Sequence, residues 1–250
     1  MKSYRMTALI VGVLFVVGTV AGVSSGVVTA PVFNAADFPA NVAREANSLV
    51  IGALLVLTMA CSLAMIPAVL FPLLRQYSET LAVGAVIFRG VLEHVGSLVT
   101  VVAWFLLIVL SRIPGGAGSP DATLLKTLST SILAVSDWVA LVSAIAFSLG
   151  ALIIYAVFYR ARLIPRWISV WALVGAVLYI AAQVWGMFES QQLPLTLEHG
   201  IGMLMIPTAI QEMFMAAWLI VKGFDRQAAG SASGRAAHAV DLVTDQAGRI

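Results

Sequence analysis

The feature that most constrains this chain is a series of long apolar segments. They occur at about residues 6–28, 49–74, 80–111, 130–159, 166–188 and 199–221. A helix needs about 20 apolar residues to cross a hydrocarbon core about 30 Å thick. Only 10% of the 250 residues are charged, whereas a soluble domain is about 25% charged. The sequence therefore predicts an all-α fold, a polytopic transmembrane helix bundle of six spans embedded in the lipid bilayer.

The first apolar segment has two interpretations. Lys2 and Arg5 precede it, and the sequence VTA at positions 28–30 loosely resembles a signal-peptide cleavage site. The apolar run is longer than that of a signal peptide, and Pro31 would follow the cut. We therefore interpret the segment as a retained span.

Basic residues in the short loops predict the orientation. With the N-terminus inside, the cytoplasmic segments contain Lys2, Arg5, Arg75, Arg160, Arg162, Arg166, Lys222 and Arg226. The outer segments contain Arg44, Arg112 and Lys126. Because basic residues favour the cytoplasmic side, both termini are predicted to be cytoplasmic. The predicted location of the protein is the cell inner (plasma) membrane. Residues 1–226 would form one membrane domain, and the Gly-, Ser- and Ala-rich residues 227–250 a mobile cytoplasmic tail.

The predicted outer loops, about residues 29–48 and 112–126, contain proline, glycine and charged residues typical of exposed turns. The sequence DATLLKTLSTS, residues 121–131, mixes polar and apolar residues. We expect it to begin the fourth helix as an interfacial stretch that lies on the outer leaflet.

Three glycines in the first span recur at every fourth position. Gly18, Gly22 and Gly26 line one face, which would let another helix approach closely. Packing inside the bundle is the expected use of this face. An oligomer formed through the first span is the alternative.

Three ionisable residues lie in the middle of the third span. From a cytoplasmic boundary near residue 80, Arg89 would lie about 13 Å deep and Glu93 about 20 Å deep. His94 follows directly. Arg89 and Glu93 are four residues apart and so share a helix face. That face must point into the protein, because a charge at the bilayer centre costs roughly 2.5–3.5 kcal/mol.

The sixth span supplies the expected partner. Glu212 stands ten residues before Lys222, which places it about 15 Å from the same boundary. We predict that Arg89 bridges Glu93 and Glu212, because its planar fork can serve two carboxylates. One arginine against two carboxylates leaves one negative charge. A proton, a cation or a small polar ligand would balance it.

Other polar residues are candidates for a vestibule that reaches this cluster from outside: His94, Asp137, Glu198, His199 and Gln211. His94 is also explained as a packing histidine with one local acceptor. Asp137 is also explained as an interfacial residue that caps or snorkels.

Several function classes lack their motifs. The three histidines have no metalloprotease or paired haem-ligand spacing, and no glycine-rich phosphate loop is present. The net charge of +2 is too small, and too scattered, to indicate nucleic acid. Cys61, the single cysteine, cannot form an intrachain disulfide. No metal, cofactor or catalytic residue is predicted, so an enzyme is the less favoured class.

Four short motifs resemble a known family. They are FRGVLE at Phe88 to Glu93, LIPRWIS at Leu163 to Ser169, and PTAIQE with WLIVKGF between Pro207 and Phe224. Over roughly residues 5–226 the chain resembles the bacterial membrane-protein family named domain of unknown function 4386. By this resemblance, the matching positions are Arg89, Glu93, Pro207, Gln211, Glu212, Lys222 and Gly223. The family pattern includes neither His94 nor Asp137, and it implies no activity.

Three functions remain open from the sequence. In the first, the cluster of Arg89, Glu93 and Glu212 binds or moves a proton, a cation or a small polar ligand. In the second, the protein is a scaffold or accessory protein in which the cluster only fixes helix packing. In the third, it is a membrane enzyme acting on lipid, with Glu212 or His94 as general base.

Overall fold

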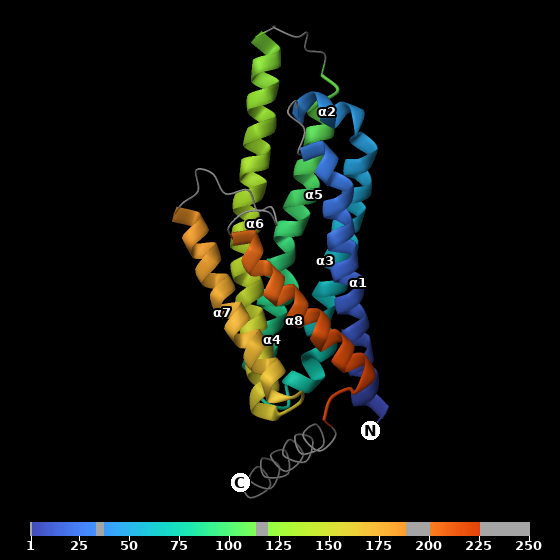
Figure 1. Cartoon of the computed structure of the whole chain (residues 1–250), viewed down its shortest axis with the longest axis vertical. Helices are drawn as coiled ribbons and strands as arrows, with labels where there is room; N and C mark the ends of the chain where they lie inside the picture. The colour runs from blue at the N-terminus through green and yellow to red at the C-terminus, as the bar shows by residue number, and fades with distance from the viewer. Residues whose placement is uncertain (1, 34–37, 114–119, 189–200, 226–250) are drawn as a thin grey trace, which may run out of the picture.

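Every regular element of the computed structural model is a helix. The structure describes residues 2–33, 38–113, 120–188 and 201–225, and no strand occurs among them. The elements are α1 (Lys2–Phe33), α2 (Phe38–Arg44), α3 (Ala46–Leu74), α4 (Glu79–Ala85), the π-helix η1 (Val86–Leu92), α5 (Glu93–Leu110), α6 (Pro120–Ala161), α7 (Arg166–Phe188) and α8 (Ile201–Val221). Figure 1 shows them as an elongated bundle.

The long helices form a closed ring. Because α4, η1 and α5 follow one another without a break, they act as one rod, and the order around the ring is α1, α3, this rod, α6, α7 and α8. Contact between α8 and α1 closes it. The Arg5 guanidinium donates to the carbonyls of Leu219 and Ile220 at 3.2 and 2.7 Å, which satisfies free acceptors at the end of α8. The start of α1 and the end of α8 therefore lie together.

Within the part of the chain that the structure describes, five helical stretches are long and apolar enough to cross a membrane: Tyr4–Phe33, Ala46–Leu74, Glu79–Leu110, Thr123–Ala161 and Arg166–Phe188. In α8, the apolar stretch Pro207–Val221 is shorter. Large apolar side chains cover the outside of the ring, and Val20, Val102 and Val177 are each more than half exposed. Such a surface suits lipid rather than water. The chain is an all-helical protein whose apolar helices are built for a membrane.

The first outer loop differs from its expected form. Helix α1 continues to Phe33, and the short α2 follows in place of an exposed turn. Val32 and Val42 are buried, and Phe33 packs against Trp104 with ring centroids 5.5 Å apart. The side chains of Val32, Phe33 and Val42 explain this, because they pack against apolar residues of α3 and α5.

The stretch at residues 121–131 begins a helix, as expected, and continues without a break into the fourth candidate span. These residues belong to α6, whose 42 residues span about 63 Å at 1.5 Å each, and its upper end projects beyond the other helices (Figure 1). Thr127, Thr130 and Ser131 donate to carbonyls three or four residues earlier. Their hydroxyls are thus satisfied inside the helix, and no residue after Pro120 breaks it.

Small residues let α1 and α3 approach closely. A methyl group on Gly18 would lie 2.6 Å from the Leu63 side chain, and one on Gly22 would lie 2.7 Å from the Met59 sulfur. The same group on Gly26 would meet nothing within 4 Å. Gly18 and Gly22 therefore pack inside the chain, against α3.

The rod formed by α4, η1 and α5 packs against α6 at the π-helix η1. Its seven residues include Arg89, and a methyl group on Gly150 would lie 2.6–3.0 Å from the Arg89 Cβ, N and Cα atoms. Backbone therefore packs on backbone at this crossing. π-Helical segments are uncommon and occur frequently at functional sites.

This crossing predicts the effect of two glycine substitutions. Gly150→Ala should destabilise the protein by roughly 1–3 kcal/mol, because the added methyl group overlaps the Arg89 backbone. Gly26→Ala is the matched control and should leave stability unchanged or slightly higher. Thermal unfolding of the purified protein in detergent measures both. Equal unfolding temperatures for the two variants would contradict the packing described.

Candidate functional site

Arg89 is the largest of the fully buried side chains among the described residues, with 2% of its side chain exposed. The Phe147 ring lies over the guanidinium, with the Arg89 Cζ atom 4.1 Å from the ring centroid, and the Phe15 ring lies at 5.8 Å. An aromatic face attracts a cation, and more strongly where water is excluded. Two rings and two carboxylates therefore surround the charge of Arg89.

Glu212 is the closer carboxylate. Arg89 Nη2 donates to Glu212 Oε1 at 2.8 Å, from η1 to α8. The Tyr155 hydroxyl of α6 also lies within hydrogen-bonding reach of the Glu212 carboxylate. Through these two partners η1, α6 and α8 meet at Glu212, so its carboxylate is held firmly.

Glu93 is held less directly. Its Oε2 atom lies 3.4 Å from Arg89 Nη1, and its Oε1 atom lies 3.9 Å from His94 Nε2. The Glu93 side chain is 14% exposed, and its Oε2 atom has no hydrogen-bond partner among the described residues. Glu93 therefore has more capacity for a further partner than Glu212.

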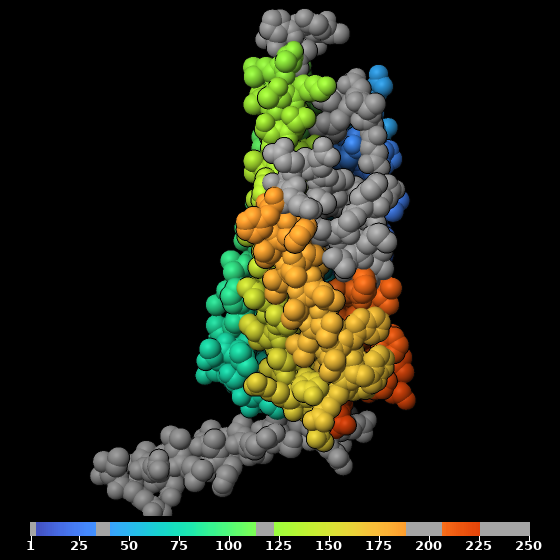
Figure 2. Space-filling view, turned by 60° about the vertical axis from the view of Figure 1, so that its left-hand side comes forward, coloured from blue at the N-terminus to red at the C-terminus, as the bar shows by residue number. Residues whose placement is uncertain are grey.

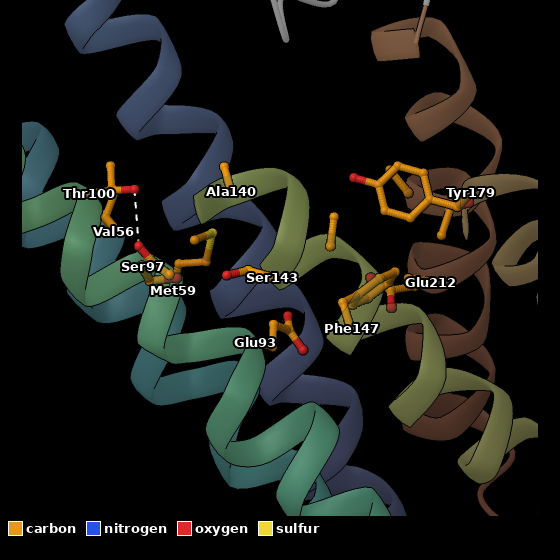
Figure 3. Close-up of a pocket in the computed structure, with 14 residues that line it drawn as sticks. Val56, Met59, Glu93, Ser97, Thr100, Ala140, Ser143, Phe147, Tyr179 and Glu212 are labelled. Atoms are coloured by element: carbon orange, nitrogen blue, oxygen red, sulfur yellow. Dashed lines mark hydrogen bonds between the residues drawn. The ribbon is translucent and has the colours of Figure 1, made fainter. Parts of the chain in front are cut away.

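Both carboxylates face a cavity of about 380 Å³ inside the ring. Apolar atoms of Val56, Met59, Ala140, Ala144, Phe147 and Ala209 line most of it. Hydroxyl groups enter from Ser97, Thr100, Ser143, Tyr179 and Thr208. Figure 3 shows Glu93, Phe147 and Glu212 grouped together, with the Tyr179 hydroxyl directed inward from α7. The volume is in the range of small-molecule pockets.

The two apolar core clusters lie on either side of this cavity along the helices. On α3, for example, Ala53 belongs to the upper cluster, Met59 lines the cavity and Ile66 belongs to the lower cluster. Packed side chains thus hold both ends of the bundle, and the cavity lies between them.

The structure brings the predicted cluster together. Both ion pairs expected for Arg89 are present, with Glu93 and with Glu212. Among the vestibule candidates, His94 lies beside Glu93. Gln211 is buried, but it does not line the cavity. Asp137 is exposed and also lies outside the cavity wall.

The remaining predictions fall on other parts of the chain. Glu198, His199 and the predicted tail at residues 227–250 lie outside the described residues. Among the described residues, no group of three or more His, Cys, Asp or Glu side chains is arranged to hold a metal ion.

Sequence reasoning missed the aromatic part of the site. Phe147, Tyr155 and Tyr179 contact the cluster or line the cavity. Phe147 lies seven residues after Ala140 and three after Ala144, which is the spacing of one helix face. In an apolar span this spacing carries little information, since aromatic residues also pack against lipid or core.

A helical bundle with apolar outer faces and a buried cluster of ionisable side chains is the architecture of an integral membrane protein. The family model described as domain of unknown function (DUF4386) matches residues 10–223. The match covers most of the chain, so the protein belongs to this family, as its motifs predicted.

Comparison with curated proteins and with solved structures found no match to either.

The ion pair between α8 and η1 predicts a coupling in stability. Arg89→Gln should destabilise by roughly 3–5 kcal/mol, because it leaves two buried carboxylates without their cation. Glu212→Gln should also destabilise, and the double variant should lose less than the sum of the two, by about 0.5–3 kcal/mol.

Unfolding in detergent measures this cycle, and Arg75→Gln with Asp137→Asn is its control. Both control residues are exposed, so their effects should add within about 0.5 kcal/mol. Additive effects of the Arg89 and Glu212 variants would contradict the direct pairing.

Proposed function

We propose that this protein binds a small, positively charged organic ligand inside the membrane, with Glu93 as its counter-ion. The observation that carries the proposal is the cavity of about 380 Å³ that both carboxylates of the cluster line. A cluster that served packing alone would have no need of a ligand-sized space beside its carboxylates.

The charge of the cluster supports a cationic ligand. With both carboxylates ionised, Arg89 contributes one positive charge and Glu93 and Glu212 contribute two negative charges, so the sum is minus one. Glu212 has two close partners, and Glu93 has longer contacts and the larger exposed fraction, 14% against 11%. The uncompensated charge therefore belongs with Glu93, at the cavity wall.

The walls favour an organic cation over an inorganic ion. Calcium takes six to eight oxygen ligands, and magnesium retains much of its water. Here the lining is largely apolar, with the Phe147 and Tyr179 rings among it. Aromatic faces and a carboxylate are the usual partners of substituted ammonium groups. A protonated amine would place its charge near Glu93 and its carbon atoms against Met59 and Phe147.

The binding experiment uses a series of ammonium ions of increasing size, from ammonium to choline. Choline and tetramethylammonium should raise the thermal unfolding temperature of the purified protein, whereas sodium and potassium at equal ionic strength should not. Glu93→Gln should abolish the shift, because it removes the counter-ion and leaves the bond between Arg89 and Glu212 in place.

Asp137→Asn is the matched control, since it removes an acidic residue on α6 that does not line the cavity. It should keep the full response. Equal shifts with potassium, or loss of the response in Asp137→Asn, would overturn the proposal.

A scaffold role is the second candidate, favoured by the nearly complete burial of Arg89 and by its backbone contact with Gly150. In that case Glu93→Gln and Glu212→Gln would lower stability, and no ammonium ion would stabilise the wild-type protein. The same melting curves distinguish the two functions.

The proposal includes six spans, with both termini on the cytoplasmic side of the inner membrane. Support comes from the position of Arg5 beside the end of α8, and from the concentration of basic residues at that end. Helix α8, as the sixth span, brings the chain back to the side on which it began.

A protease site fused after Ile250 tests this topology. Protease added to inverted membrane vesicles should cut the site, and protease added to intact spheroplasts should not. The same site inserted between Gly115 and Gly116, in the predicted outer loop, should give the opposite pattern. Cleavage after Ile250 in spheroplasts would exclude the proposed orientation.

A further inference from the structure

A second cavity lies at the end of the bundle where α6 and α8 end and α7 begins. Its volume is about 460 Å³. Arg162, Arg166 and Lys222 line it together with Asp225. Three positive charges and one negative charge give a sum of plus two. This cavity and the cavity beside Glu93 have no lining residue in common.

We infer that this cavity binds the phosphate-bearing headgroup of an anionic phospholipid. Its position supports a lipid as the source of the phosphate. The candidate spans end at Ala161 and begin at Arg166, so the basic side chains lie where the apolar segments meet the headgroup layer. Trp167, half exposed next to Arg166, is a residue typical of that layer.

The two loops that form the cavity are fixed to each other. The Asp225 backbone N–H donates to the Leu163 carbonyl at 2.9 Å. Leu163 and Phe224 are buried, and the Phe224 ring packs edge-on against Phe158 with centroids 5.5 Å apart. The charged groups are therefore carried by a built pocket and not by loose loop ends. In Figure 2 the yellow loop between α6 and α7 lies beside the end of α8 at the lower end of the molecule.

The backbone at Arg162 adds a second observation. Both loops turn out of a helix through a residue with positive φ, Arg162 at 55° and Gly223 at 78°. At position 223 the residue is glycine, for which a positive φ costs little. At position 162 it is arginine, whose side chain makes a positive φ less favourable. An unfavourable backbone conformation at a charged pocket indicates that the side chain is needed there.

Other charges at this end have different uses. Arg5 caps the carbonyls at the end of α8, and Arg166 also lies over the Tyr159 ring at 5.3 Å. Helix α7 begins at Arg166, which lines the cavity, so the positive end of the helix dipole lies beside this pocket and favours an anion. Arg162 and Lys222 come from separate loops and are the residues on which the test depends.

The experiment measures binding of phosphatidylglycerol and phosphatidylcholine to the purified, detergent-solubilised protein by native mass spectrometry. Phosphatidylglycerol should bind more tightly. Arg162→Gln and Lys222→Gln should each weaken it about fivefold, and the double variant about 25-fold, since each basic residue near an anionic headgroup contributes about a factor of five. Arg162→Lys should restore binding.

Arg160→Gln is the matched control, because Arg160 is exposed two residues away and does not line the cavity. It should change affinity less than twofold. A further variant, Arg162→Gly, separates binding from folding: its unfolding temperature should not fall, because glycine adopts the positive φ freely, while its lipid affinity falls.

Three results would overturn the inference. One is equal binding of the two lipids. Another is an equal loss in Arg160→Gln, which would indicate a diffuse basic face. The third is displacement of phosphatidylglycerol by inorganic phosphate at the same concentration, which would indicate a site for free phosphate.

Discussion

The rest of the structure depends on the neutralisation of one buried charge, that of Arg89. A guanidinium in a medium of low dielectric is stable only with close partners, and removing a partner from such a group is costly. Glu212 supplies one from α8, Glu93 one from the rod that carries Arg89, and Phe147 an aromatic face from α6. Gly150 lets α6 come against the backbone of η1 at the same level. The position of three rods along their axes is thus tied to this point, because sliding any of them by one turn would separate the charges.

The same requirement produces an asymmetric pair of carboxylates. Glu212 is held by Arg89 and Tyr155, whereas Glu93 keeps an oxygen without a hydrogen-bond partner among the described residues. Apolar clusters above and below fill the bundle, but between them the small residues Ala140, Ala144 and Ala209 leave space beside Glu93. The carboxylates are held in place by packing, and the cavity beside them is already open. Binding a ligand there therefore needs little rearrangement. The basic pocket beside Arg162 follows a different principle, since its charges remain exposed at the end of the bundle.

Much of the site was predictable because charge stands out in an apolar sequence. Depth along a helix follows from residue number, so Arg89, Glu93 and Glu212 could be assigned to one level before any contact was known. The helical spacing that identified Arg89 and Glu93 as neighbours served less well for Asp137, a candidate for the vestibule wall, which is exposed on α6. Spacing tells which residues share a face, but neighbouring helices decide which face turns inward. Phe147 and Tyr155 were missed for a related reason, since an aromatic residue in an apolar span has many possible partners.

The sequence by itself determined that this is a helical membrane protein of the DUF4386 family with a buried arginine and two carboxylates at matching depth. These properties follow from composition, from segment length and from the cost of charge in lipid, all of which are local. Only the tertiary structure decided that the helices close into a ring and that η1 widens into a π-helix at Arg89. It also decided that a cavity opens beside Glu93 and that two loops join around Arg162 and Lys222. Each of these depends on the fit of side chains from helices far apart in the chain, and that fit is a property of the packed bundle and not of any single segment.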